Sequence, residues 1–441
     1  MNNEIAEIDY ITERNALVER VKASLISSLN LDYAPEQIHA DEILFGAGFG
    51  LDSIDSLQLT VAIKSDLGVE IKDTDMWALR SVNTLVDYIM KDKGLLDWSQ
   101  ARNRLDSYTV NDSSLLGYNQ IRNDAIFFEN TDYLLLRLNG EEELLKLNAL
   151  VSKDIDFTPE GSVTQTLLLD NEGSLISNLY FMNNFDHHYL LFPKENQKNI
   201  LTQLQLANIE FDDITSRCTF FSLEGYKASE IIETCFDVVA SLMRPYTFSL
   251  ETLGGEQEFL TVRIDTYGEF GYLIVSFDNL GKEAILQRFA SHDIPVSNIN
   301  EQITFNIMQL LWLESCHFHP SICFLKGENL IEAGLAALLS FDKDNFIGKK
   351  ALESMVINNR LVHFQSDKSV EIGDLLTVEG SDVGYVVACH FSPLLNLYVG
   401  NAYVSKKYSV SGASFESKKN SATISLVSAP QIMGHSYLDI I

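Results

Sequence analysis

A serine at the start of a predicted helix is the residue best placed to do chemistry in this chain. Ser53 follows Asp52 after a glycine-containing loop, and apolar residues recur after it at helical spacing. We expect Ile54, Leu57 and Val61 to share one buried helix face, which leaves the Ser53 hydroxyl at the exposed amino end. The free N–H groups and the dipole at such an end favour a phosphate-linked group. The alternative is that Ser53 only caps the helix, as serine often does.

The segments around Ser53 resemble an acyl carrier protein over roughly the first ninety residues. Residues 41–45 lead into the serine, residues 67–71 follow its helix, and residues 82–89 have the pattern of a carrier's last helix. The resemblance implies an all-α, four-helix carrier domain over residues 1–93, with 4′-phosphopantetheine on Ser53 and an acyl thioester on its thiol. It also implies the partners of a carrier: a phosphopantetheinyl transferase, an acyl- or aminoacyl-loading enzyme and other enzymes of a biosynthetic pathway.

Composition limits the classes of partner. The chain has 441 residues and a formal charge of −30. Its length is enough for several domains, and its 46% hydrophobic and 21% charged residues are typical of globular proteins rather than disordered ones. Such acidity argues against nucleic acid or an anionic membrane as a partner, because phosphates would be repelled. No apolar stretch of about 18 residues is uninterrupted, and the first residues lack a signal-peptide pattern. The five scattered cysteines fit reduced thiols, so we expect a cytoplasmic protein.

The rest of the chain divides by pattern into three parts. A polar stretch over residues 94–118 is the predicted linker, which would let the carrier swing. Strand and helix patterns alternate over residues 119–355 and predict an α+β core. Short strands dominate residues 356–441 and predict a small terminal β-barrel.

Several segments beyond residue 120 resemble the aminomethyltransferase family, which includes the T-protein of the glycine cleavage system. They occur in the family's order and lie at residues 139–155, 171–179, 267–272, 330–335, 342–352, 383–384 and 392–393. The resemblance implies an α+β fold of three subdomains that ends in the small β-barrel. It also implies a channel that binds tetrahydrofolate, and a transferase that handles one-carbon units.

The resemblance also indicates candidate site residues, although several depart from the family's pattern. Ser177 and Asn178 stand where T-proteins carry two aspartates, the second of them catalytic, and an amide is neither an anion nor a base at neutral pH. Asn178 is therefore a candidate orienting amide, and Glu269 is the remaining candidate acid near the channel. Leu273 replaces a glutamate that pairs with the pterin ring, which would cost about 1–3 kcal/mol for each unpaired donor. The candidate channel or cofactor-binding residues are Ser177, Tyr267, Leu273, Met308 and Trp312, of which Met308 and Trp312 replace arginines of the family.

The segment that contains Cys316, His317, His319 and Cys323 has residue types that could bind a metal. If it is a strand, His317 and His319 share a face, but no paired CxxC or HExxH motif completes a ligand set. We therefore expect no metal.

The fusion is the strongest clue to function, because a tether raises the local concentration of a carried group to the millimolar range. The leading hypothesis is a biosynthetic enzyme whose T-protein-like part modifies an acyl or aminoacyl thioester on Ser53 by tetrahydrofolate-linked one-carbon transfer. One alternative is that the T-protein-like part acts on the tethered substrate without folate, by an elimination, cyclisation or condensation. Another is a non-catalytic domain that docks the loaded carrier.

Overall fold

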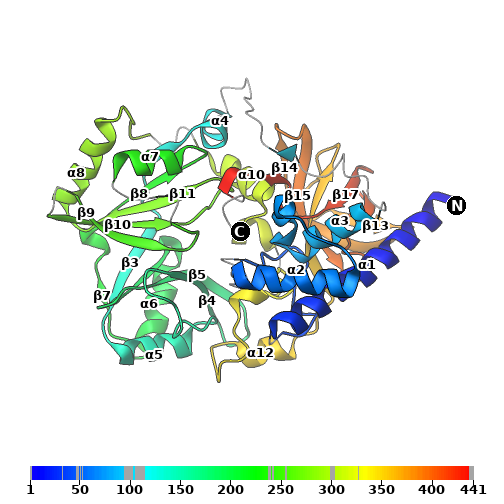
Figure 1. Ribbon diagram of the computed structural model, residues 1–441, viewed down its shortest axis with the longest axis horizontal. Helices are drawn as coiled ribbons and strands as arrows, with labels where there is room; N and C mark the ends of the chain where they lie inside the picture. Colours follow the sequence, from blue (N-terminus) through cyan, green and yellow to red (C-terminus); the bar gives the residue numbers. More distant parts are fainter. Residues whose placement is uncertain are drawn as a thin grey trace. The chain divides into compact units, whose positions relative to one another are not determined.

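The computed structural model describes residues 2–31, 33–45, 49, 51, 53–93, 103–104, 115–236, 240, 243–253, 256–297, 303–325 and 327–436. The chain forms two compact units. The first, here called the carrier–barrel unit, comprises residues 1–106, 305–337 and 356–441. The second, here called the two-sheet unit, comprises residues 107–304 and 338–355. Figure 1 shows the elements of each unit in the colours of the sequence.

The carrier begins the first unit as a small helical domain. Its elements are α1 (Asn2–Leu29), α2 (Ser53–Leu67), the 3₁₀ helix η1 (Asp73–Arg80) and α3 (Val82–Asp92). They enclose a core that includes Val21, Leu25, Leu59, Ile63 and Leu85. Ser81 begins α3 with a capping box, in which the Ser81 and Thr84 side chains each bond the other's backbone N–H. The helical character of the carrier is confirmed. Its described residues form three α-helices and one 3₁₀ helix, so the exact four-helix carrier is not confirmed.

The buried face of α2 differs from the predicted one. Ile54, Leu57 and Val61 are 72%, 67% and 62% exposed. The residues of α2 that pack inward are instead Ser56, Leu59, Ile63 and Leu67. The helix carries two apolar stripes at helical spacing, and the carrier core buries the second of them. The prediction that Ile54, Leu57 and Val61 are buried was therefore wrong.

The same unit ends in a closed β-barrel, as the sequence predicts. The barrel order is β12-β15-β14-β13-β16-β17, and it is drawn in orange and red in Figure 1. The strands are β12 (Asn359–Ser366), β13 (Leu375–Val378), β14 (Ser381–Ser392), β15 (Leu397–Ser405), β16 (Ser414–Ser417) and β17 (Thr423–Val427). Helices α10 (Phe305–Ser315) and α11 (Pro320–Cys323) belong to this unit, as does the parallel pair β1 (Asn103–Arg104) and β18 (Ile432–Met433).

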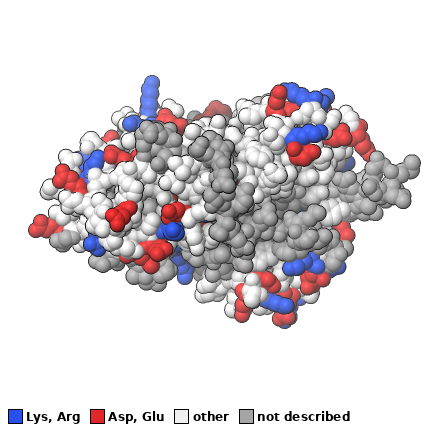
Figure 2. All heavy atoms as spheres, turned by 90° about the horizontal axis from the view of Figure 1, so that it is seen from above, with Lys and Arg blue, Asp and Glu red and all other residues white. Residues whose placement is uncertain are grey.

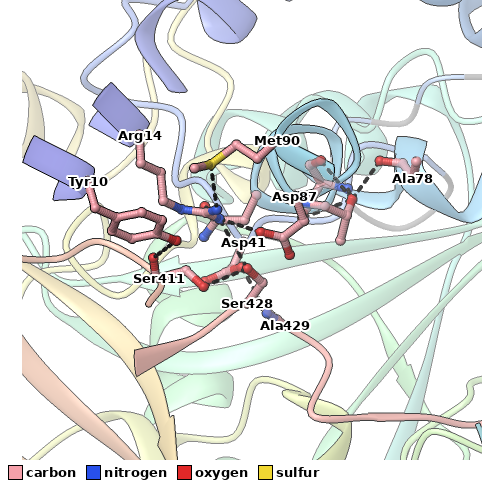
Figure 3. A network of polar contacts seen from close by, with 12 residues as sticks. Tyr10, Arg14, Asp41, Ala78, Asp87, Met90, Ser411, Ser428 and Ala429 are labelled. Atoms are coloured by element: carbon pink, nitrogen blue, oxygen red, sulfur yellow. Dashed lines mark hydrogen bonds and ion pairs between the residues drawn. The ribbon is translucent and has the colours of Figure 1, made fainter. Parts of the chain in front are cut away.

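The carrier packs directly on the barrel through polar contacts, which Figure 3 shows around Arg14. The Tyr10 hydroxyl donates to the Ser411 carbonyl at 3.1 Å, and Arg14 Nη2 lies 3.3 Å from the Ser428 hydroxyl. The Ala429 N–H donates to the Asp41 carboxylate at 2.9 Å. These bonds join the carrier to the barrel in this structure, and the swinging carrier that the sequence predicts stays a prediction. Of the predicted linker 94–118, only residues 103–104 and 115–118 lie within the described ranges.

His39 forms a further buried contact between carrier and barrel. Its Nε2 donates to the Leu361 carbonyl at 2.7 Å, and its Nδ1 accepts the Asp41 N–H at 3.2 Å. Both ring nitrogens of the neutral imidazole are therefore used, and a proton on Nδ1 would remove the second bond. Burial, followed by the charge of Arg360, lowers the pKa of His39 from 6.5 to about 4; Asp41 opposes this shift and His363 adds to it.

We expect His39 to make the carrier–barrel unit sensitive to acid. Because its pKa is lower in the folded than in the unfolded chain, the unfolded chain binds the extra proton as pH falls from 6.5 towards 4, so stability is lost in that window. The full effect is about 3 kcal/mol, of which about 2 kcal/mol is lost by pH 5. Urea unfolding at pH 7 and pH 5 measures it. His39→Gln should reduce this pH dependence, while the control His292→Gln, in the two-sheet unit, should leave it unchanged.

The two-sheet unit contains two five-stranded sheets whose facing sides form a shared core. The sheet orders are β4-β5-β6-β3-β7 and β2-β8-β11-β10-β9. The strands are β2 (Ile126–Glu129), β3 (Tyr133–Leu138), β4 (Val163–Leu169), β5 (Leu175–Asn183), β6 (His188–Pro193), β7 (Asp212–Asp213), β8 (Thr219–Glu224), β9 (Phe248–Leu253), β10 (Gln257–Arg263) and β11 (Gly271–Ser276). The shared core includes Leu135, Tyr180, Leu191, Val262 and Leu273.

Helices cover the outer sides of both sheets. The α-helices of this unit are α4 (Leu116–Asn123), α5 (Glu141–Leu150), α6 (Gln197–Leu206), α7 (Ala228–Cys235), α8 (Asn279–Ala290) and α12 (Lys349–Ser354). Leu147 of α5 and Leu204 of α6 pack on the first sheet, and Ile232 of α7 and Ile285 of α8 pack on the second. Residues that alternate along each strand therefore face either the helices or the shared core.

Candidate functional site

Ser53 lies where a carrier serine must lie to be modified. It is the first residue of α2 and its side chain is exposed. The Ser56 hydroxyl donates to the Ser53 carbonyl at 2.8 Å, which fixes the first turn of the helix. Asp52 lies outside the described residues. An exposed hydroxyl at a helix amino end can accept a phosphate-linked group, because the first-turn N–H groups and the helix dipole stabilise the phosphate.

The exposed side chains of Ile54, Leu57 and Val61 form an apolar stripe that begins next to Ser53. Three large apolar side chains on one exposed helix face are typical of a surface that binds another protein. We call this surface the α2 stripe.

Asn178 faces the core between the two sheets. Gln165 Nε2 donates to Asn178 Oδ1 at 3.0 Å, so β4 fixes the orientation of the amide. Tyr180 follows on the same face of β5; burial raises its pKa to about 12, and a hydrogen bond from Asn178 opposes the rise. The amide of Asn178 therefore contacts both Gln165 and Tyr180, and its role as an orienting amide stays a prediction.

Ser177 faces the opposite side of the same strand. Its hydroxyl is buried, accepts from Asn196 Nδ2 at 3.2 Å and donates to the Asn178 carbonyl at 3.1 Å. The neighbours of Ser177 along the strand on this side, Leu179 and Phe181, belong to the helix-covered core. The structure therefore separates Ser177 from the side chain of Asn178.

A cluster of tyrosines and one carboxyl group occupies the inner face of the two-sheet unit. Tyr133 interacts electrostatically with Tyr180, Tyr267 and Glu224, and burial is the main reason that the pKa of Tyr133 is raised well above its usual value. Burial, then the charges of Glu224 and Asp132, raise the pKa of Tyr267. We call Tyr133, Tyr180, Tyr267 and Glu224 the tyrosine–carboxyl cluster.

Glu224 is a candidate residue that the sequence reasoning missed. It is 6% exposed, and among the described residues its Oε2 has no hydrogen-bond partner. Burial, then the charge of Asp265, raises the pKa of Glu224 well above its usual value, which favours a neutral acid that can both donate and accept. Gly271 is its partner on β11, and a Cβ atom there would lie 2.5 Å from Oε2. The sequence feature that could have indicated Glu224 is its position at the end of the apolar run 219–223, directly before a glycine.

Leu273 is an apolar neighbour of Glu224 and cannot form its hydrogen bonds. It is 5% exposed, belongs to the shared core and pairs with Ser222 on β8, two residues before Glu224. Because alternate residues share a strand face, Ser222 and Glu224 project to the same side. The polar group on this face is thus supplied by β8.

Glu269 is held in a buried ion pair. Its Oε1 lies 3.1 Å from Arg122 Nη1, and each side chain is 1% exposed. The same guanidinium nitrogen donates to the Tyr267 carbonyl at 3.3 Å. This contact connects α4 to the turn before β11, and it gives Glu269 a structural role beside the predicted catalytic one.

We expect Glu269→Ala to destabilise the two-sheet unit by about 3–5 kcal/mol, because it leaves the Arg122 guanidinium buried without its partner. Denaturant unfolding measures the loss. The double variant Arg122→Met/Glu269→Leu should recover much of it, because no unpaired charge remains. Arg217→Ala, which removes an exposed ion pair with Asp212 in the same unit, should cost no more than about 1 kcal/mol. An equal loss in Arg217→Ala and Glu269→Ala would contradict this account.

Met308 and Trp312 belong to α10 of the carrier–barrel unit. Trp312 is 5% exposed and stacks on the imidazole of His319 with ring centroids 3.8 Å apart. His319 also caps α11 by accepting the Ser321 N–H at 3.2 Å. Across the described ranges, no group of three or more His, Cys, Asp or Glu residues gathers closely enough to hold a metal ion.

Figure 2 shows small groups of basic side chains beside acidic ones on the face seen from above. None of the helices in the described part of the chain has the length and apolar character needed to cross a membrane.

The fold and the exposed serine define the class of protein: a phosphopantetheine carrier fused to an aminomethyltransferase-like domain. The phosphopantetheine attachment site family matches residues 19–89, and the GCVT N-terminal domain family matches residues 97–343. The second match covers more than half of the chain, which therefore belongs to the GCVT family. The carrier and aminomethyltransferase resemblances seen in the sequence are thus confirmed.

Curated relatives and a solved structure agree with this assignment. The chain is 24% identical over 294 residues to an aminomethyltransferase of Caldanaerobacter subterraneus subsp. tengcongensis, covering 63% of this chain and 76% of the relative. It is 22% identical over 310 residues to an aminomethyltransferase of Flavobacterium psychrophilum, covering 66% and 84%. The structure of the glycine cleavage system aminomethyltransferase T from Bartonella henselae superposes with a TM-score of 0.62 at 15% identity, covering 76% of this chain and 96% of that one. This likeness shows the fold.

Proposed function

We propose that this protein is a biosynthetic transferase that modifies an acyl or aminoacyl group held as a thioester on its own carrier. The observation that carries the proposal is an exposed Ser53 in the same chain as an aminomethyltransferase-like domain. Ser53 fits the attachment of 4′-phosphopantetheine, because its hydroxyl is exposed at the amino end of α2. The tether would supply the substrate at an effective concentration in the millimolar range.

The chemistry that best suits the family is one-carbon transfer with tetrahydrofolate, which supplies the one-carbon unit when bound. The two-sheet unit offers polar groups that fit a folate. A neutral Glu224 can both donate to and accept from the polar edge of a pterin ring. Its Oε2 has no hydrogen-bond partner in the part of the chain that the structure describes, and a pterin would supply one, because an unsatisfied polar group is costly in a buried site. Asn178 would orient a polar group of the substrate from β5.

Calorimetric titration of tetrahydrofolate into the full chain tests the folate part of the proposal. We expect saturable binding that Glu224→Leu weakens by about tenfold or more, since losing one buried hydrogen-bonding group costs about 1–3 kcal/mol. Glu258→Gln is the matched control, because Glu258 is exposed on β10. Absence of binding at millimolar tetrahydrofolate would rule out this chemistry.

A folate-independent reaction on the carried group is the second candidate. It is favoured by Leu273, which places an apolar side chain where the family has its pterin-pairing glutamate, and by the amide at Asn178. An elimination, cyclisation or condensation would then persist when folate is omitted. A non-catalytic docking domain would instead leave a loaded carrier unchanged under all conditions.

The α2 stripe gives a prediction about the enzyme that attaches the prosthetic group. We expect Leu57→Glu to slow modification of Ser53 by a phosphopantetheinyl transferase about tenfold or more, because a charge replaces an apolar contact next to the serine. Stability should change by no more than about 0.5 kcal/mol, since Leu57 is 67% exposed. Rates of prosthetic-group addition, followed by intact-protein mass spectrometry, measure the effect. Leu206→Glu is the control, because Leu206 on α6 is 71% exposed. This variant should be modified at Ser53 at the normal rate.

A further inference from the structure

A cavity lies between the carrier and the barrel, inside the carrier–barrel unit. Its walls include Lys22 and Asn83 of the carrier, and Arg360 and Lys406 of the barrel part. Its volume is about 80 Å³, several times the roughly 10–15 Å³ that one buried water needs. The cavity can therefore hold a small polyatomic ion, and both the carrier and the barrel would contact that ion.

Lys22 and Arg360 bring two buried positive charges to this cavity. Both residues are 6% exposed. Lys22 Nζ donates to the Pro35 carbonyl at 3.2 Å, and Arg360 Nη2 donates to the carbonyl of the next residue, Glu36. The two cations therefore bond adjacent peptide groups of the carrier, although Lys22 belongs to α1 and Arg360 to β12.

Lys406 adds a third positive charge, on the exposed side of the cavity. It follows β15 directly, and its N–H donates to the Asn358 carbonyl at 2.9 Å. Its ammonium forms no ion pair or hydrogen bond with the described residues. Burial is the main reason that the pKa of Lys22 is lowered; Glu19 opposes the shift, and the charges of Arg360 and Lys406 add to it. An anion among the three cations would relieve this repulsion.

Two carboxylates also line the cavity, but the three cations outnumber them among the described residues. Glu19 Oε1 lies 3.4 Å from Lys22 Nζ, and the Glu19 side chain is 55% exposed, so this contact is weak. The Asp41 carboxylate already accepts the Ala429 N–H at 2.9 Å. The described walls therefore carry a net positive charge, in a chain whose formal charge is −30.

The other carboxylates near Arg360 are held by the backbone or face the solvent. Glu332, Glu42 and Glu36 interact electrostatically with Arg360. Glu332 and Glu42 accept backbone N–H bonds of 2.6–2.8 Å, and Glu36 is exposed. They compensate the cost of burying Arg360 without occupying the cavity.

The groups left for a ligand are hydrogen-bond donors. Arg360 has five N–H groups, and its bonds to described residues go to the Ile331 and Glu36 carbonyls. Asn83 Oδ1 accepts from Arg14 Nη2 at 3.2 Å, which leaves the Asn83 NH₂ for the cavity. Ammonium and guanidinium groups together with amide N–H groups are the usual partners of phosphate oxygens.

We propose that this cavity is a binding site for a phosphate-type anion, with Lys22, Arg360 and Lys406 as its cations. The anion is inorganic phosphate or the phosphate group of a small metabolite, since the same donors suit both. Because it contacts the carrier and the barrel together, its binding stabilises the folded unit. The proposal goes beyond the proposed function and requires neither the modification of Ser53 nor folate.

Calorimetric titration of the full chain with sodium phosphate tests the proposal. The apo chain is used, so that no prosthetic group competes for the site. We expect saturable binding with a Kd of about 1 mM or below, as a few charge-assisted hydrogen bonds provide. Phosphate at about ten times its Kd should also raise the ratio of folded to unfolded chain about tenfold in urea unfolding. Sodium chloride at the same ionic strength should give neither effect.

Glycerol 3-phosphate separates the two sources of the anion. Tighter binding than that of inorganic phosphate indicates a metabolite phosphate, because the rest of the molecule then adds contacts. Weaker binding indicates free phosphate.

Lys406→Ala and Lys407→Ala form a matched pair of variants. Both lysines are exposed, but the Lys407 ammonium lies 4.8 Å from the centre of the Tyr408 ring. Lys406→Ala should weaken phosphate binding about fivefold or more and leave the urea midpoint without phosphate unchanged. Lys407→Ala should change the affinity by no more than about twofold.

Lys22→Met removes a buried cation of the site and keeps its apolar stem. It should weaken phosphate binding about tenfold or more. If this variant does not fold, the pair at residues 406 and 407 still decides the question. Absence of saturable binding at about 10 mM phosphate, or an equal loss of affinity in Lys406→Ala and Lys407→Ala, would overturn the proposal.

Discussion

Ser53→Ala is expected to abolish attachment of phosphopantetheine completely, and with it every reaction of the carried group. Ser53 provides the hydroxyl at the amino end of α2, and alanine cannot form the phosphate ester. Stability should change by no more than about 0.5 kcal/mol, because Ser53 is exposed. Intact-protein mass spectrometry after treatment with a phosphopantetheinyl transferase measures the result.

Ser65→Ala is the control for this experiment. Ser65 is exposed on the same helix but lies near its carboxyl end, where a phosphate has no favourable dipole. This variant should gain one phosphopantetheine as the unchanged protein does. A Ser53→Ala chain that is still modified would place the attachment site on another hydroxyl and contradict the assignment.

Arg14→Ala is expected to destabilise the carrier–barrel unit by about 3–5 kcal/mol. Arg14 Nη2 lies 2.6 Å from Asp87 Oδ1, and the two side chains are 1% and 8% exposed. The same nitrogen also lies 3.2 Å from Asn83 Oδ1. It lies 3.3 Å from the Ser428 hydroxyl, which Figure 3 shows beside Arg14. Alanine therefore leaves a buried carboxylate without its cation and removes a bond between carrier and barrel.

Denaturant unfolding of the full chain measures this loss against two further variants. Arg14→Met/Asp87→Leu should recover part of the stability, because it removes both charges together. Arg20→Ala should cost no more than about 0.5 kcal/mol, since the contact of Arg20 with the Asp66 carbonyl is exposed. If Arg14→Ala proved as mild as Arg20→Ala, the carrier would not be held on the barrel by this network.

The features that could be predicted from the sequence are those that depend on the local pattern of residues. A short apolar segment with a serine in register is enough to place Ser53 at the start of a helix, and short alternating strands are enough to predict the terminal barrel. Which of two apolar stripes packs inward is not a local property. The stripe with Leu59 and Ile63 is buried because α1 and α3 complete its core, and Leu57 stays outside.

The parts of the candidate sites that the sequence could not predict depend on contacts between distant strands. Glu224 acquires its environment from Gly271 and Tyr133, which lie on other strands. The period-two alternation of a strand does predict that Ser177 and Asn178 face opposite sides. Their roles as site residues stay predictions, as do those of Tyr267, Glu269, Leu273, Met308 and Trp312.

We propose that the aminomethyltransferase-like part modifies the group carried on Ser53. Mass spectrometry of the holo chain from its native source, with ejection of the prosthetic group, tests it before and after incubation with methylenetetrahydrofolate. We expect an ejected group that is heavier than phosphopantetheine alone and whose mass increases by one one-carbon unit after incubation. An unmodified Ser53, or an ejected group whose mass methylenetetrahydrofolate leaves unchanged, would contradict it.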